Sequence, residues 1–182
     1  MRVISGIARG TKLDSRESIS TRPTLDRIKE NMFNLIQDCI VDSIVLDLFA
    51  GSGQLGIEAL SRGARKCYFC DNDKEDILFL KKNIEKTHFS EKSEVFNTDF
   101  KQLLNSINEK CDLIFIDPPY KSEFVSQSLE KIYERQILNK DGIIVIETDE
   151  TQKIQELLNS RTYINVLKTK NYGRVSLFII SF

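Results

Sequence analysis

Residues 44–56 read IVLDLFAGSGQLG, and this stretch decides the fold of the 182-residue chain. It opens with an apolar run typical of a buried β-strand, in which Asp47 is the charged exception. Gly51 and Gly53 follow at once, and an apolar helical spacing begins at Leu55. Glycines allow a tight turn and let a ligand approach the backbone, so strand, glycine turn and helix together form a nucleotide-binding unit. The stretch therefore predicts an α/β fold that binds a nucleotide-containing cofactor.

A carboxylate follows where such a unit contacts the ribose. Asp71 lies 20 residues after Gly51 and closes the strand-like run at 66–70. There it can accept hydrogen bonds from both ribose hydroxyls. A nicotinamide or flavin nucleotide and S-adenosylmethionine all contain an adenosine ribose, so these two signals leave the cofactor open between them.

The motif Asp117, Pro118, Pro119 and Tyr120 favours S-adenosylmethionine. It follows the apolar run at 113–116, so it ends a buried strand. Prolines fix φ and have no N–H, which makes this strand end rigid and rich in acceptors. Acceptors beside an aromatic ring suit a planar base with an exocyclic amine, which an amino-methyltransferase binds and a hydride-transfer enzyme does not. We predict that these four residues are catalytic. Taken alone, the motif would also fit an ordinary Pro-Pro loop.

The remaining pattern alternates strands and helices. We expect strands near residues 43–49, 66–71, 93–97, 112–117 and 142–147, and helices near 54–62, 74–87, 100–108, 123–135 and 151–159. Such alternation predicts a parallel sheet with helices on both faces. Two further strand-like runs, 163–170 and 175–182, predict an antiparallel hairpin at the end of the chain. A mostly parallel seven-stranded sheet with this terminal hairpin is the class I methyltransferase fold, not the plain dinucleotide fold.

The segment before the sheet carries an excess of positive charge. Residues 2–7 and 8–13 have the pattern of a short glycine-turned hairpin, and Thr24 suits the N-cap of a following helix. Residues 1–31 contain seven Lys and Arg against four Asp and Glu, in a chain of net charge −1. A basic end on a nearly neutral protein suits recognition of one structured nucleic-acid site and argues against indiscriminate coating of nucleic acid.

The composition excludes several other classes. With 41% hydrophobic and 29% charged residues, the chain is an ordinary globular protein. No apolar stretch approaches the ~20 residues of a membrane span, and the N-terminus lacks a signal-peptide h-region, so we expect a cytoplasmic protein. Cys67 and Cys70 lie inside a strand pattern, where a spacing of three puts them on opposite faces. They are therefore expected to be core thiols, and no metal site is expected.

Motifs along essentially the whole chain resemble the RsmD family of bacterial 16S ribosomal RNA guanine-N2 methyltransferases. The most specific is RPTLDRIKENMFN at 22–34. The others are RVI at 2–4 with Gly6, Arg9-Gly10 and Leu13, the glycine turn, EALSRGA at 58–64, the DPPY motif, and Gly173. Two positions depart from the family: Asp71 stands where Glu is more usual, and Gln54 replaces a small residue. The chain also starts almost at the hairpin, without the longer leader of some members.

The resemblance implies methyl transfer from S-adenosylmethionine to the exocyclic N2 of a guanine in small-subunit ribosomal RNA, within an assembling 30S particle. It implies an RNA-facing extension at 1–40 and a methyltransferase domain at 41–182, in one compact unit. The cofactor-binding residues it implies are Asp47, Phe49, Gly51, Ser52, Gly53, Asp71, Asn72, Asp99 and Phe100. The residues it implies at RNA phosphates are Arg9, Lys12, Arg22 and Arg27.

Several alternatives stay open at this point. Asp99 also fits a plain N-cap of the helix at 100–108, and each basic residue also fits a solvated or helix-paired charge. A DNA adenine-N6 methyltransferase can use the same DPPY motif, and only the N-terminal signature argues against it. A catalytically silent RNA-binding assembly factor would keep the fold, although the intact Asp117, Pro118 and glycine turn argue against that function.

Overall fold

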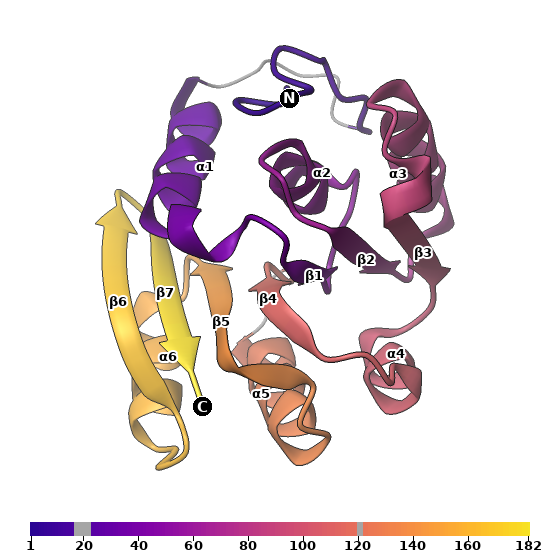
Figure 1. Cartoon of the computed structure of the whole chain (residues 1–182). Coiled ribbons are helices and arrows are strands. Elements are labelled where there is room, and N and C mark those ends of the chain that lie inside the picture. The colour runs from indigo at the N-terminus through magenta and orange to yellow at the C-terminus, as the bar shows by residue number, and fades with distance from the viewer. Residues whose placement is uncertain (17–22, 120–121) are drawn as a thin grey trace.

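The computed structural model describes residues 1–16, 23–119 and 122–182, and its centre is a seven-stranded sheet (Figure 1). The strands are β1 (Ile44–Asp47), β2 (Lys66–Asp71), β3 (Ser93–Asn97), β4 (Cys111–Ile116), β5 (Leu138–Thr148), β6 (Asn165–Tyr172) and β7 (Val175–Ser181). They lie in the order β3-β2-β1-β4-β5-β7-β6, with β1 to β5 parallel and β7 antiparallel to both of its neighbours. This confirms the predicted class I methyltransferase sheet and its terminal hairpin.

Two layers of helices cover the sheet (Figure 1). On one face lie α1 (Pro23–Leu35), α2 (Gln54–Ser61) and α3 (Lys74–Lys86), and on the other α4 (Phe100–Ser106), α5 (Ser122–Glu134) and α6 (Thr151–Asn159). Among the described residues, no helix is long and apolar enough to cross a membrane.

Two of the element boundaries that differ from those expected have a clear physical reason. Helix α1 begins at Pro23, so Thr24 lies inside the helix and the predicted N-cap was wrong. Proline suits the first turn, where its missing N–H leaves no helical hydrogen bond unmade. Strand β5 begins at Leu138, earlier than expected, because Leu138 pairs with Cys111 before an irregularity shifts the register.

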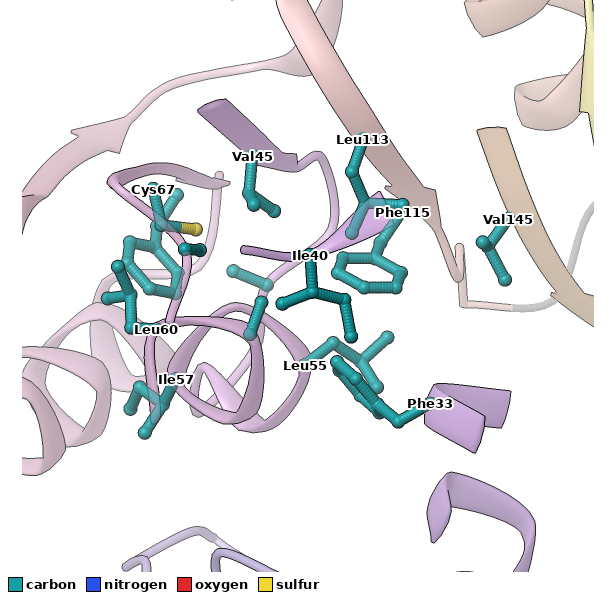
Figure 2. Close-up of a cluster of buried hydrophobic side chains, with 14 of the residues drawn as sticks. Phe33, Ile40, Val45, Leu55, Ile57, Leu60, Cys67, Leu113, Phe115 and Val145 are labelled. Carbon is teal, nitrogen blue, oxygen red and sulfur yellow. The ribbon is translucent and has the colours of Figure 1, made fainter. Parts of the chain in front are cut away.

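The core divides between the two faces of the sheet because side chains alternate along each strand. Val45, Leu113, Phe115 and Val145 belong to the cluster under α1 and α2, where Phe33 and Leu55 meet them (Figure 2). The intervening residues Ile44, Leu46, Ile114, Ile116, Ile144 and Ile146 form a second cluster with α4, α5 and α6. Cys67 and Cys70 fall in different clusters, as predicted, and burial raises the pKa of Cys70 to about 12.

The N-terminal segment is less regular than the predicted hairpin. One antiparallel bridge, Arg2 to Lys12, joins its two halves in the described residues. The backbone between them also bonds to α2. The N–H groups of Ile4 and Ser5 donate to the Glu58 carboxylate at 2.7 and 3.0 Å, and that of Ile7 donates to the Ser61 carbonyl at 2.9 Å. Across the segment itself, the Val3 N–H donates to the Thr11 carbonyl, the Gly10 N–H to the Val3 carbonyl and the Leu13 N–H to the Met1 carbonyl, at 2.9–3.0 Å. The predicted hairpin is therefore present as a short, irregular pairing that is also held by α2.

Glu58 is the centre of this attachment. Its side chain is fully buried, with Arg62 Nε at 2.8 Å and Lys29 Nζ at 3.4 Å. Lys29 is also buried and donates to the Arg2 carbonyl at 2.6 Å. One carboxylate thus joins α1, α2 and the N-terminal segment. Its removal would leave the buried Lys29 charge unpaired and the N–H groups of Ile4 and Ser5 without their acceptor.

We expect Glu58→Ala to lower the free energy of unfolding by about 3–5 kcal/mol, because removing one partner strands a buried positive charge and two backbone donors. Urea unfolding measures this difference. The matched control is Glu85→Ala, an exposed glutamate on α3, which should change stability by no more than about 0.5 kcal/mol. Equal effects of the two substitutions would contradict the role assigned to Glu58.

Candidate active site

A glycine turn at the carboxyl end of β1 forms one wall of the site. Gly51 and Gly53 have φ values of 52° and 85°, in the left-handed region that side chains rarely adopt. A Cβ at Gly53 would also lie 2.3 Å from a methyl carbon of Leu80, so α2 and α3 pack closely only with glycine there. The Gly51 N–H donates to Asp71 Oδ2 at 2.8 Å, which ties the turn to the end of β2.

The first cavity, here called the glycine-loop cavity, has a volume of about 310 Å³. Of the predicted cofactor residues it is lined by Asp47, Phe49, Gly51 and Ser52, whereas Gly53 does not line it. Its remaining lining residues were not among the predicted cofactor-binding residues: Met1, Ser15, Arg16, Ala50, Gln54, Leu55, Asp76 and Asp117. Arg16 reaches it from the N-terminal segment and forms ion pairs with Asp73, Glu75 and Asp76 at the start of α3.

A second, smaller cavity of about 70 Å³ opens beside β2 and is called the aromatic cavity. It brings together the predicted residues Asp71, Asn72, Asp99 and Phe100 with Phe49. Phe49, Phe100 and Phe124 form an aromatic cluster here, with ring centroids 5.1–6.2 Å apart. Rings and carboxylates together can hold a flat, polar-edged group such as a nucleoside.

Asp99 also caps a helix, as its alternative interpretation expected. Its carboxylate accepts the Lys101 N–H at 2.8 Å at the start of α4. Lining the aromatic cavity and capping α4 are compatible, because a carboxylate has more lone pairs than this one bond uses. Contact between Asp99 and a bound ligand stays a prediction.

The DPPY motif follows β4, which lies between β1 and β5. Asp117, Pro118 and Pro119 line a third cavity of about 230 Å³, called the strand-end cavity, and Asp117 lines the glycine-loop cavity as well. Tyr120 lies outside the described residues, and so does Arg22. Asp117 is thus the residue at which the two larger cavities meet.

Burial dominates the electrostatics at the strand ends. Asp47 is 2% exposed, and burial raises its pKa to about 7 against the hydrogen bond that it accepts from the Gly56 N–H at 2.9 Å. The charges of Asp117 and Asp71 raise the pKa further. Burial likewise raises the pKa of Asp117 and of Glu147, a residue of β5 that was not predicted. A site of closely spaced carboxylates attracts a positively charged or donor-rich ligand.

Three of the four predicted phosphate-binding residues are described by the structure, and they lie on the surface. Arg9, Lys12 and Arg27 are exposed, and no carboxylate of the described residues forms an ion pair with them. Their contact with RNA stays a prediction. Among the described residues, no group of three or more His, Cys, Asp or Glu side chains has the geometry to hold a metal ion.

Comparison with known proteins shows which family this chain resembles. The model of a family described as "Conserved hypothetical protein 95" matches residues 1–181. The ribosomal RNA small subunit methyltransferase D of Haemophilus influenzae is 37% identical over 97% of this chain and 91% of its own length. Its namesake from Escherichia coli strain K12 is 33% identical over 82% and 75% of the two chains. The solved structure of yhhF from Escherichia coli superposes with a TM-score of 0.84, at 27% identity, covering 99% of this chain and 96% of its own.

The raised pKa of Asp47 predicts a specific dependence of stability on pH. Ionising Asp47 is harder in the folded chain than in the unfolded chain. The contribution of Asp47 to the free energy of unfolding therefore falls as the pH rises from about 4 through 7. Asp47→Asn keeps the shape without this titration. We expect its stability relative to the wild type to increase by up to about 4 kcal/mol across that range, as urea unfolding at each pH measures. A difference that does not change with pH would contradict the assignment.

Proposed function

The chain belongs to the family described as "Conserved hypothetical protein 95", the RsmD family, and on that premise we propose that it is an S-adenosylmethionine-dependent methyltransferase acting on the exocyclic N2 of a guanine in small-subunit ribosomal RNA. The observation that carries the proposal is the position of Asp117 between the glycine-loop and strand-end cavities. A methyl donor in the first cavity and a base in the second would meet at its carboxylate.

The two cavities beside the glycine turn fit S-adenosylmethionine. The glycine-loop cavity has buried and half-buried carboxylates, Asp47 and Asp117, suited to the cationic methionine end. The aromatic cavity has Asp71 for the ribose hydroxyls and rings for the adenine. Gly51 contributes backbone that a ligand can approach, because no atom within 4 Å occupies the position of its absent side chain.

The reaction needs orientation more than acid-base strength. S-adenosylmethionine supplies an electrophilic methyl group. The guanine N2 is a poor nucleophile, because its lone pair is delocalised into the ring. Asp117 and the Pro118 carbonyl accept hydrogen bonds from the amine and turn its lone pair toward the methyl carbon for in-line attack. Asp117, or a water beside it, takes the proton that N2 loses. Tyr120 stacks on the base, which must leave its helix to enter the strand-end cavity.

The N-terminal segment binds the RNA. Arg9, Lys12, Arg22 and Arg27 contact phosphates, and residues 1–40 form the RNA-facing extension of the domain at 41–182. The relatives named as small-subunit ribosomal RNA methyltransferases support RNA over DNA as the substrate. The enzyme then acts in the cytoplasm on an assembling 30S particle.

Cofactor binding should depend on Asp71. We expect Asp71→Ala to weaken S-adenosylmethionine binding by about 1–3 kcal/mol, because charge-assisted hydrogen bonds to the ribose are lost. Isothermal titration calorimetry measures this change. Asp71→Asn, which keeps one acceptor oxygen, should lie between the Ala variant and the wild type. Unchanged affinity in the Ala variant would move the ribose contact elsewhere.

RNA binding should depend on exposed charge at Arg9 and Lys12. Point substitutions are the right probe, since deleting the segment would uncover Glu58. In the Arg9→Ala, Lys12→Ala variant we expect weaker binding, and a slope of log affinity against log salt smaller in magnitude by about 1.5–2. Filter binding at several salt concentrations measures both. The matched control, Lys110→Ala with Lys140→Ala, removes two exposed charges elsewhere. A similar effect in both variants would make the contribution nonspecific.

Asp117 should matter for methyl transfer and little for cofactor affinity. In Asp117→Ala we expect single-turnover transfer to fall by about 100-fold or more while cofactor affinity stays within a few fold, the signature of an interaction used mainly in the transition state. Asp117→Asn should be milder, because its amide oxygen still accepts from the amine. Near-normal transfer by the Ala variant would show that another residue activates the amine.

A further inference from the structure

Four neighbouring strands place a carboxylate at the same edge and on the same face of the sheet. Asp47 pairs in register with Phe69 of β2 and Phe115 of β4. Asp71 and Asp117 come two residues after these phenylalanines, so strand alternation directs them to the same face as Asp47. Ile116 pairs with Ile146, which puts Glu147 of β5 next to Asp117. The order along the edge is therefore Asp71, Asp47, Asp117, Glu147.

Glu147 differs from the two cofactor-side members of this row. Asp71 accepts the N–H groups of Gly51 and Asp73, and Asp47 accepts that of Gly56. No described residue donates a hydrogen bond to the Glu147 carboxylate, although it is half-buried. A half-buried carboxylate without a donor from the protein has acceptor capacity left for a ligand that supplies donors.

The position of Glu147 indicates which ligand supplies these donors. Glu147 lines the strand-end cavity with Asp117, Pro118 and Pro119, while Val125 and Val175 contribute apolar wall. It does not line the glycine-loop cavity, where the methyl donor is proposed to bind. Glu147 therefore faces the base that receives the methyl group, on the side of Asp117 away from the cofactor.

Guanine and adenine differ next to their amines. In guanine the amine adjoins N1–H, a donor, whereas in adenine it adjoins N1, an acceptor. A carboxylate can accept N1–H and one amine proton of guanine together, but it faces the N1 lone pair of adenine. A carboxylate that faces the N1 lone pair of adenine discriminates strongly against that base, because neither acceptor regains the hydrogen bonds to water that it lost.

We propose that Glu147 is the residue that selects guanine, by accepting hydrogen bonds from N1–H and N2 while Asp117 accepts the other N2 proton. This inference rests on the proposed function and deepens it. Burial and the charge of Asp117 raise the pKa of Glu147, and the donors of guanine favour the charged carboxylate, so binding the base and ionising Glu147 assist each other.

The test compares guanine with 2,6-diaminopurine, which keeps the N2 amine, replaces N1–H by an acceptor and carries an amine in place of O6. The guanine that the wild-type enzyme methylates is mapped first, and RNA with diaminopurine at that position then competes with the guanine RNA in one reaction. We expect the wild type to favour guanine by about 100-fold or more in kcat/KM. Glu147→Gln presents an amide N–H to the N1 acceptor, so its preference should shift toward diaminopurine by about 10-fold or more.

The ratio of kcat/KM for the two RNAs is measured within one variant, so it does not depend on the fraction of that variant that is folded. Asp149→Asn, which removes an exposed charge from the same cavity, is the control and should keep the wild-type ratio. Glu147→Ala, with neither donor nor acceptor, should give a ratio of guanine to diaminopurine between those of the wild type and Glu147→Gln. A wild type that accepts both bases equally, or a wild-type ratio in Glu147→Gln, would overturn the inference. Absence of any guanine methylation by the wild type would instead defeat the proposed function.

Discussion

The parallel pairing of β4 between β1 and β5 is the constraint on which the site depends. Because all three strands run the same way, their carboxyl ends reach one edge of the sheet. The glycine turn, the DPPY motif and Glu147 come from segments far apart in the sequence, and this edge collects them. In open α/β sheets, ligands generally bind outside the carboxyl ends of the strands, at the point where the strand order reverses. The loops that leave two neighbouring strands there run in opposite directions and leave a crevice between them.

The collected charges have a physical consequence. Burial and mutual repulsion raise the pKa of Asp47, and burial also raises that of Asp117. The folded chain holds these groups at some cost in stability, which is typical of groups kept for binding and not for folding. A cationic methyl donor and a donor-rich base both relieve that repulsion, so the proposed ligands complement the same row of carboxylates from its two ends.

Local sequence was enough to predict most of the fold and many of the residues that line the three cavities. The glycine turn, Asp71 and DPPY carry their chemistry in residues that are contiguous or regularly spaced, and the alternation of strands and helices follows from burial. Arg16 and Met1 were missed, because they reach the glycine-loop cavity through the attachment of the N-terminal segment to Glu58. Glu147 was missed because its role depends on the register between β4 and β5, which strand pattern alone does not specify. Register is a long-range property, and so is the attachment of the N-terminal hairpin to a buried carboxylate.

Methylation of a guanine at N2 in small-subunit RNA is the proposed activity of this chain. The most direct test incubates the full chain and isotopically labelled S-adenosylmethionine with small subunits that have not been modified, then digests the RNA and identifies the labelled nucleoside by mass spectrometry. We expect labelled N2-methylguanosine at one nucleotide, and no label in adenine-containing duplex DNA treated in parallel. Label in N6-methyladenine, or S-adenosylmethionine that binds without any transfer to RNA, would contradict it.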